Sequence, residues 1–417
     1  MKKIIKFKFS ILFFLILISF IIRLVAVLLY GDTRIDHEWG TLLHNLYNHK
    51  TYAFYEFENK LIPTSYMPPL YPFILFFLKI LSFEKINIFY LIFSFQILLS
   101  VISIYIFYKI NEQFFSSKIS IINSFIFSLF PLNIYGVTQT SSITLQIFLS
   151  LLFLRYFFLI TNDSSNKNIL IFSLICSLSL LTRGEFVLIF IPTLFYIFIF
   201  RKMTISNLIK IFLISLIIVS PYLIRNYIHF GKIHIVNVTG YALLKGNNQS
   251  LLVEGFGSKG ESETELWKRE GIEFKLENIP HNNSYAVKKD KIFFEAAIKN
   301  ILNEPSVYFI FYIKKMFSFY FFNINSGYKN YYHFIHIIPV ALIAILSLPG
   351  FIIFSKSKDF HKRYFMIYLV LYILIFSLFF ILPRYKLAIL PIQIVLSTFS
   401  VNYLLNKLTL GIKKITR

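Results

Sequence analysis

Two carboxylates stand close together in the segment TRIDHEWG, which lies between two long apolar runs. They belong to Asp36 and Glu38. The apolar and aromatic positions that follow have helical spacing along one face: Trp39, Leu42, Leu43, Leu46 and Tyr47. The pattern predicts an amphipathic helix on a bilayer surface with both acids at its start, where free N–H groups favour carboxylates. Position alone leaves two interpretations of Asp36 open, because it could cap this helix or take part in chemistry.

The composition shows which kind of scaffold must hold these acids. Of the 417 residues, 57% are hydrophobic and 15% are charged, and apolar runs of about 18 residues or more recur. The first run has the basic start of a signal peptide, but it is about 20 residues long and no small-residue cleavage site follows, so we expect an uncleaved first span. The single cysteine, Cys176, excludes an intrachain disulfide.

The formal charge of +22 would fit a nucleic-acid-binding protein only if the basic residues formed one surface. Residues 226–305 hold ten acids and ten lysines or arginines, so this segment is neutral. The excess lies in short loops and tails, at Lys2, Lys3, Lys6, Lys8, Arg201, Lys202, Lys356, Lys358, Lys362, Arg363, Lys407, Lys413, Lys414 and Arg417. This distribution is typical of cytoplasmic loops beside anionic lipid and excludes a nucleic-acid groove.

We therefore expect an all-α polytopic membrane protein with about ten transmembrane helices, within a range of about nine to twelve. The expected spans cover approximately 9–30, 69–83, 88–110, 119–137, 142–160, 169–200, 207–224, 333–354, 364–382 and 387–405. If every basic loop is cytoplasmic, 169–200 crosses once. The segment 306–322 then lies in the interface without crossing, in agreement with the two lysines in its middle, Lys314 and Lys315.

This topology divides the chain into three regions. Residues 1–225 form an N-terminal transmembrane module that includes a first outer loop at 31–68, residues 226–332 form a second outer loop with an interfacial helix, and residues 333–417 form C-terminal helices and a basic cytoplasmic tail. Both termini are expected in the cytoplasm. Both outer loops are then expected at the outer face of the cell membrane, with juxtamembrane helices.

Four motifs in order give the chain a family resemblance. An acid in the first outer loop, an amphipathic helix and then PPLYP resemble the membrane-embedded GT-C glycosyltransferases, in particular the bacterial relatives of dolichyl-phosphate-mannose protein mannosyltransferases, which include the lipid A aminoarabinose transferase. LTRGEFVLIFIP is similar to a second family segment, with Gly184 where proline is common. SPYLIRNYIHFGKIHIVNVTGYALLKGNN and PRYKLAILP resemble two further motifs. The resemblance covers most of the chain.

The resemblance implies a hexosyl- or pentosyltransferase that takes its sugar from a polyprenyl phosphate in the bilayer. Asp36 matches the family acid that acts on the acceptor, and Glu38 is a second candidate. A carboxylate there would take the proton of the acceptor hydroxyl as attack on the sugar develops. Because the sequence shows no nucleophile–base pair, direct attack would invert the anomeric centre. The acceptor stays open between protein, lipid and glycan.

The leaving polyprenyl phosphate calls for cations. Candidates at the outer mouth are Arg34, Lys60, Arg225, Lys245 and Arg384. The RN and GNN motifs add Asn226, Gly246 and Asn247 as candidate substrate-loop residues. Alternatives remain, because an arginine at the end of a span is often an interface anchor and GNN is a common turn.

Two further features concern charge and metal. Arg183 and Glu185 interrupt an apolar run, where an internal ion pair is the default expectation. The nine histidines show no metal-binding spacing, so we predict no cofactor, although a divalent metal stays open.

The main alternative to an enzyme is a transporter or flippase for lipid-linked glycans, and another is a polymerase component of cell-envelope assembly. Transporters usually combine broken spans with internal repeats. Only the region of Arg183 fits that description, and no repeat is evident. The resemblance therefore favours glycosylation over transport.

Overall fold

The computed structural model describes residues 2–35, 38–256, 262–328 and 333–415. Most of the chain forms a helical bundle made of α1 (Lys2–Tyr30), α4 (Ile88–Asn111), α5 (Ser117–Leu129), α6 (Pro131–Val137), α7 (Ile143–Asn162), α8 (Asn166–Thr182), α9 (Val187–Ile199), α10 (Ile205–Phe230), α16 (Phe334–Ser355), α17 (Phe360–Phe376) and α18 (Leu390–Ile415). Their shared core is rich in phenylalanine and isoleucine. The all-α expectation is confirmed.

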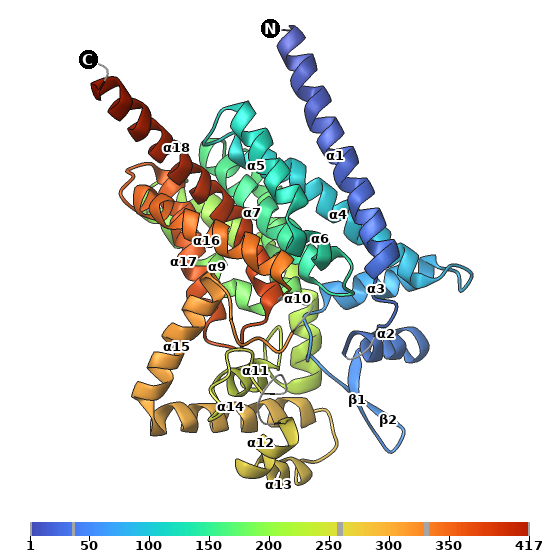
Figure 1. The fold of residues 1–417 in the computed structure, drawn as a ribbon. Helices are drawn as coiled ribbons and strands as arrows, with labels where there is room; N and C mark the ends of the chain where they lie inside the picture. Colours follow the sequence, from blue (N-terminus) through green and yellow to red (C-terminus); the bar gives the residue numbers. More distant parts are fainter. Residues whose placement is uncertain (1, 36–37, 257–261, 329–332, 416–417) are drawn as a thin grey trace.

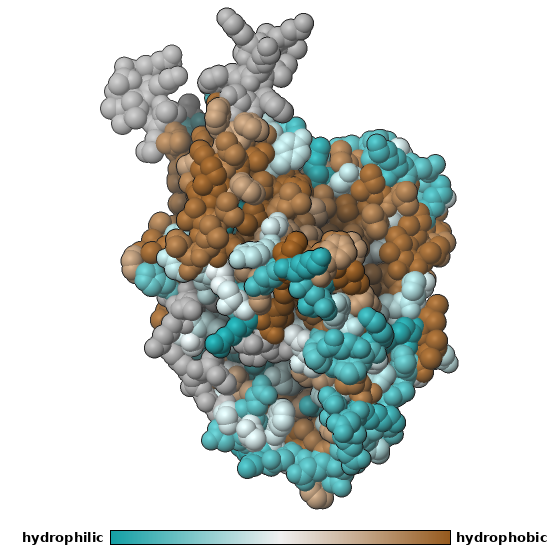
Figure 2. All heavy atoms as spheres, turned by 90° about the vertical axis from the view of Figure 1, so that its right-hand side faces the viewer, coloured by the Kyte–Doolittle hydropathy of each residue, from teal (hydrophilic) through white to brown (hydrophobic). Residues whose placement is uncertain are grey.

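Most of the remaining elements gather at one end of the bundle, which we call the loop end. They are α2 (Glu38–His49), β1 (Ala53–Phe57), β2 (Lys60–Pro63), α3 (Leu70–Leu81), α11 (Thr239–Gly246), α12 (Glu263–Arg269), α13 (Ile272–Glu277) and α14 (Tyr285–Asn303). The helix α15 (Pro305–Tyr320) connects α14 with the bundle. Both termini lie at the opposite, terminal end (Figure 1). The view in Figure 2 shows apolar side chains over the bundle and hydrophilic ones over the loop end. The two predicted outer loops thus lie together, and the assignment of the loop end to the outer face stays a prediction.

Five helices are long and apolar enough to cross a membrane among the described residues: α1, α4, α7, α10 and α16. The pair α5 and α6, bent by 55°, would make a sixth. The helices α8, α9 and α17 are shorter. The expected number of about ten crossings therefore stays a prediction.

A proline and a buried arginine explain the bend between α5 and α6. Pro131 has no N–H to offer the carbonyl oxygen of Phe127, and the side-chain amide of Asn133 donates to that oxygen instead at 3.2 Å. The buried guanidinium of Arg23, from α1, donates to the carbonyl oxygen of Ser128 at 3.1 Å and to the hydroxyl of Ser100 at 2.7 Å. Side chains thus replace the helical hydrogen bonds that the break removes.

The predicted span at 69–83 is wrong. The helix there, α3, has only 12 residues and a length of about 18 Å, too short for the hydrocarbon layer. Both of its ends lie beside α2, because the rings of Trp39 and Tyr71 are 5.1 Å apart and the hydroxyl of Tyr47 donates to Glu84 at 2.8 Å. The segment therefore lies at the loop end, and the prolines before it set its direction.

The prediction that 169–200 crosses once is also wrong. The chain breaks at Arg183 and a short 3-10 turn, η1 (Gly184–Phe186), and α9 runs back toward the terminal end. The hydroxyl of Tyr196, near the end of α9, donates to the carbonyl oxygen of Phe360 at 2.9 Å. The end of α7 reaches the same place, since Thr161 contacts His361 at 2.9 Å. Hydropathy alone could not show that the chain reverses here.

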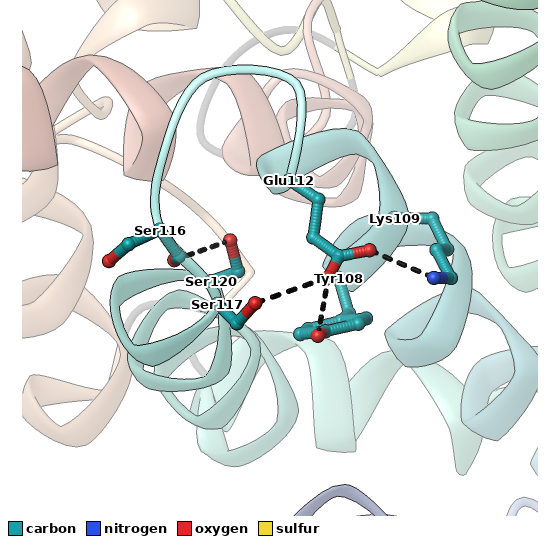
Figure 3. A network of polar contacts seen from close by, with 6 residues as sticks. All are labelled: Tyr108, Lys109, Glu112, Ser116, Ser117 and Ser120. Atoms are coloured by element: carbon teal, nitrogen blue, oxygen red, sulfur yellow. Dashed lines mark hydrogen bonds and ion pairs between the residues drawn. The ribbon is translucent and has the colours of Figure 1, made fainter. Parts of the chain in front are cut away.

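The terminal end has its own polar network at the turn between α4 and α5 (Figure 3). The carboxylate of Glu112 accepts hydrogen bonds from the hydroxyl of Tyr108 at 2.6 Å and from the ammonium of Lys109 at 2.8 Å. The hydroxyl of Ser117 lies 3.5 Å from the same carboxylate. Because these contacts are local and lie away from the loop end, we assign them to holding the turn.

Cysteine labelling checks the orientation of the bundle. A membrane-impermeant thiol reagent should label Asn48→Cys in intact cells and should label Lys202→Cys and Lys358→Cys only after the membrane is opened. All three positions are exposed, and the native Cys176 is buried and should stay silent. Labelling of Lys202→Cys but not Asn48→Cys in intact cells would reverse the assignment. A cysteine at Ser258, also expected outside, falls outside the described residues.

Candidate functional site

A cavity of about 300 Å³ lies at the loop end between the two outer segments. We call it the interloop cavity. Its walls come from α2, β1, α11, α12, α14 and the adjoining loops, and its lining residues are Glu38, Phe54, Tyr55, Tyr66, Asn237, Tyr241, Glu263, Trp267, Ala286, Lys289, Asp290 and Phe293. Four of these side chains are acidic or basic, and six are aromatic.

We call the predicted outer loops at 31–68 and 226–332 the first and second outer segments. The first outer segment forms one wall of the cavity through a helix and a hairpin. The predicted amphipathic helix is confirmed as α2, with Leu42, Leu43 and Leu46 buried and Glu38 in its first turn. The β1–β2 hairpin was not predicted. Its two-residue turn, Glu58 and Asn59, has positive φ at both positions, as a tight hairpin requires. The rings of Phe54 and Tyr66 stack at 4.8 Å beside this hairpin.

The second outer segment is fastened to the first by hydrogen bonds. The backbone N–H of Asn237 donates to the carbonyl oxygen of Ser65 at 3.0 Å, and the hydroxyl of Ser65 contacts His234 at 2.7 Å. The guanidinium of Arg225, on α10, donates to the carbonyl oxygens of Thr64 at 2.7 Å and of Tyr52 at 3.0 Å. These hydrogen bonds hold the two segments that line the cavity in a defined position relative to each other.

Asp290 anchors α11 against α14. Its carboxylate accepts the backbone N–H of Tyr241 at 3.1 Å, at the start of α11. Burial raises the pKa of Asp290 to about 6, and the hydrogen bonds from the backbone of Tyr241 and Gly240 act in the opposite direction. A Cβ atom on Gly240 would lie 2.0 Å from the carbonyl oxygen of Asp290, so the close packing of the two helices requires glycine here.

The charged side chains of the cavity are held in defined positions. The hydroxyl of Tyr241 donates to the carboxylate of Glu263 at 2.5 Å. The ammonium of Lys289 lies over aromatic rings, 4.9 Å from the centroid of Tyr55 and 5.6 Å from that of Trp267. Burial lowers the pKa of Lys289, and nearby Glu263 raises it.

Several polar groups of the cavity have no partner. Asn237 is only 7% exposed, yet both its amide nitrogen and its amide oxygen lack hydrogen bonds among the described residues. The indole N–H of Trp267 is also buried without a partner there. Unpaired buried polar groups are rare in folded proteins, and these belong to two side chains that line the cavity.

The predicted phosphate-binding cations separate into two groups. Lys245 and Arg384 lie close enough to interact electrostatically, and Glu38 and Glu263 lie within the same range of Lys245. Burial lowers the pKa of Lys245, which packs 4.9 Å from the ring of Phe380.

The other three cations lie elsewhere. Arg34 is exposed, and Lys60 is exposed on the hairpin. Arg225 already holds two carbonyl oxygens, so its RN motif is explained by structure. Asp36 lies outside the described residues, two positions before Glu38.

The predicted substrate-loop residues have structural contacts. Asn226 lies inside α10, not in a loop, and its amide donates to the carbonyl oxygen of His234 at 2.7 Å. Gly246 and Asn247 end α11, where the buried ammonium of Lys315 donates to the carbonyl oxygen of Gly246 and to the side-chain oxygen of Asn247, both at 2.9 Å. A role for these three residues in substrate binding stays a prediction.

The expected ion pair between Arg183 and Glu185 does not form. Arg183 donates instead to the amide oxygen of Gln146 at 3.2 Å and lies 5.1 Å from the ring centroid of Tyr385. Within the described ranges no group of three or more histidine, cysteine, aspartate or glutamate side chains could hold a metal ion. Metal dependence therefore stays untested.

Sequence reasoning missed several cavity residues. Asn237 and Asp290 gave no signal, because an isolated asparagine or aspartate in a polar segment is usually exposed. Lys289 and Trp267 stand in two charged stretches, and each stretch alone predicts a solvent-exposed helix. Only the fold shows that the same helices enclose a cavity.

A helical bundle with juxtamembrane helices and two outer segments at one end defines the fold class of the GT-C membrane glycosyltransferases. Two structures of the archaeal oligosaccharyltransferase from Archaeoglobus fulgidus illustrate the likeness. The first, AglB in complex with an inhibitory peptide and a dolichol-phosphate, has a TM-score of 0.54 at 13% identity and covers 97% of this chain and 51% of that one. The apo form has a TM-score of 0.52 at 12% identity and covers 96% and 51%. The present chain thus spans about half the length of these structures.

A family match agrees with the resemblance over part of the chain. Residues 67–224 match the family model described as dolichyl-phosphate-mannose-protein mannosyltransferase. The match begins at the MPPLYP segment and ends within α10. Among curated proteins, none matches the chain significantly.

Proposed function

We propose that this protein is an integral membrane glycosyltransferase that moves a sugar from a polyprenyl-phosphate donor to an acceptor at the outer face of the cell membrane. The family match over 67–224 and the GT-C fold support this function. The archaeal neighbour of the same fold was solved with a dolichol-phosphate, which favours a lipid phosphate as the donor here also. The interloop cavity carries the proposal, because Glu38 lines it at the loop end.

The reaction follows from the chemistry of the parts. The acceptor oxygen forms a bond to C1 of the donor sugar, and the bond between C1 and the phosphate oxygen breaks with its electron pair on the phosphate. The acceptor proton passes to a carboxylate, which we assign to Asp36 with Glu38 as the second candidate. Attack from the face opposite to the phosphate inverts the anomeric centre.

The departing phosphate gains negative charge and needs donors in a place of low dielectric. Lys245 and Arg384 fit this role best among the predicted cations, because they lie within electrostatic range of each other, and Lys245 lies near Glu38 and is already partly desolvated. Arg34 and Lys60 are exposed and would be screened by water. Arg225 would have to give up its bonds to the first outer segment.

A donor-cleavage assay separates this enzyme from a lipid carrier. The purified protein in lipid nanodiscs receives a polyprenyl phosphate that carries a radiolabelled sugar, together with candidate protein, lipid and glycan acceptors. We expect label to leave the lipid and to appear on one acceptor class. Label that moves between the leaflets of proteoliposomes while the C1–phosphate bond stays intact would instead identify a flippase.

A further inference from the structure

We propose that the interloop cavity binds the acceptor and that this acceptor is an uncharged carbohydrate. The inference rests on the function proposed above and gives its unidentified acceptor a chemical class. It is carried by the walls of the cavity, by its unpaired polar atoms, by its charge and by its size.

The walls offer flat apolar surfaces on several sides. The stacked pair of Phe54 and Tyr66 lies on the side of the first outer segment. Trp267 lies on the other side, tilted against Phe293 with ring centroids 5.5 Å apart. One face of a sugar ring carries mainly C–H groups and packs well on such rings. Aromatic walls with a few polar groups between them are the usual form of a small-molecule site.

The unpaired polar atoms match hydroxyl groups. The side chain of Asn237 carries a donor and an acceptor, and Trp267 carries a donor. These atoms are covered by neighbouring groups, so both side chains, which line the cavity, must turn toward it to meet a ligand. A sugar hydroxyl both donates and accepts, so neighbouring hydroxyls can satisfy an amide at both atoms. A ligand without hydroxyl groups would leave these buried atoms unpaired.

The charge of the cavity selects against anions. Three carboxylates, of Glu38, Glu263 and Asp290, face it together with one ammonium, that of Lys289. Asp290 is occupied by backbone N–H groups, whereas Glu263 accepts from Tyr241 and keeps lone pairs for a further donor. Carboxylates accept hydrogen bonds from neutral hydroxyls and repel a second carboxylate. An uncharged ring fits this lining better than an acidic one.

The size of the cavity agrees with one or two sugar rings. Its volume of about 300 Å³ lies at the lower end of the range of small-molecule sites.

Tryptophan fluorescence tests the binding directly, without transfer. The chain has only two tryptophans, so in a Trp39→Phe background Trp267 is the sole reporter and lies in the cavity wall. The protein in nanodiscs is titrated with methyl glucoside, methyl N-acetylglucosaminide, methyl glucuronide and a serine- and threonine-rich peptide. We expect a saturable change with at least one neutral glycoside. The anionic glucuronide should bind at least tenfold more weakly than methyl glucoside.

Variants locate the binding site. Asn237→Ala should weaken binding of the neutral glycoside by about tenfold, which corresponds to the loss of about 1.4 kcal/mol in hydrogen bonding. Its melting temperature should stay unchanged, because the amide has no partner to lose. Asn278→Ala is the matched control, since Asn278 is exposed on the same outer segment and its affinity should equal that of the parent.

The outcomes separate this inference from the proposed function. Donor cleavage with transfer to the peptide, and no fluorescence response to any glycoside, would overturn the carbohydrate acceptor and leave the glycosyltransferase standing. A glycoside response that Asn237→Ala weakens, with the donor left intact under all acceptors, would support the carbohydrate site and overturn the glycosyltransferase. Equal affinity for methyl glucoside and methyl glucuronide would overturn the inference as well. So would a loss of glycoside affinity in Asn278→Ala equal to the loss in Asn237→Ala.

Discussion

Replacing Asp36 by asparagine is expected to lower sugar transfer by about 10²-fold or more, while the protein still inserts and binds donor lipid. The amide keeps the shape of the side chain, but it removes the basic oxygen that would take the proton of the acceptor. Glu38→Gln should do less harm. Initial rates of label transfer at matched expression give the comparison, with binding of the labelled donor as a second measurement.

An exposed acid in the same outer segment provides the control. Glu58 lies in the hairpin turn, and Glu58→Gln should keep the parental rate. Near-normal transfer by Asp36→Asn with loss in Glu38→Gln would pass the role to Glu38, which the structure places at the cavity. If both variants stayed active, the GT-C interpretation of this loop would be wrong.

Replacing Arg225 by methionine is expected to lower the free energy of unfolding by about 2–3 kcal/mol. The change removes the charged donor of two buried residues: the carbonyl oxygen of Thr64 loses its bond to Arg225, and that of Tyr52 keeps only the backbone N–H of Thr64. Arg225 is itself partly exposed, so the loss should stay near the lower end of what two bonds to a charged donor can contribute. Equilibrium unfolding in mixed micelles with increasing SDS measures the difference.

Two further variants make this second result specific. Arg225→Lys keeps the charge but reaches only one of the two carbonyl oxygens well, so it should fall between the parent and Arg225→Met. Arg34→Met removes an exposed arginine of the first outer segment and should change stability by no more than about 0.5 kcal/mol. Equal stability of Arg225→Met and the parent would show that the two outer segments do not depend on this link.

Local patterns in the sequence predicted local structure well. The spacing of Leu42, Leu43 and Leu46 predicted α2, because the helical period alone decides which side of such a helix is apolar. The positions of the basic loops predicted that the two outer segments lie on the same side of the bilayer, because loops rich in lysine and arginine usually face the cytoplasm. The expected span at 119–137 did not include the bend after α5, although Pro131 stands at the break.

Contacts between distant segments could not be read in the same way. Hydropathy gives α3 and α9 the same apolar character as a span, but it does not show that α3 stays at the loop end or that α9 turns back. The cavity could not be predicted for the same reason, because it forms through contacts between distant segments. Tyr55, Asn237 and Lys289 meet there from three segments, and each residue taken alone looks like an ordinary exposed position.

The buried guanidinium of Arg23 has a consequence for biogenesis. A charged residue near the centre of a span costs about 2.5–3.5 kcal/mol during insertion, and the surrounding apolar residues of α1 outweigh this cost. The hydroxyl of Ser100 and the carbonyl oxygen of Ser128 are synthesised 77 and 105 residues later. Within α1 the guanidinium donates only to the carbonyl oxygen of Ser19, so a nascent chain carries an incompletely paired cation in its first span until the helices from α4 to α5 arrive beside it. Translation beyond Ser128 therefore marks the stage at which the N-terminal helices can associate stably, and chains that stop earlier expose a polar defect to membrane quality control.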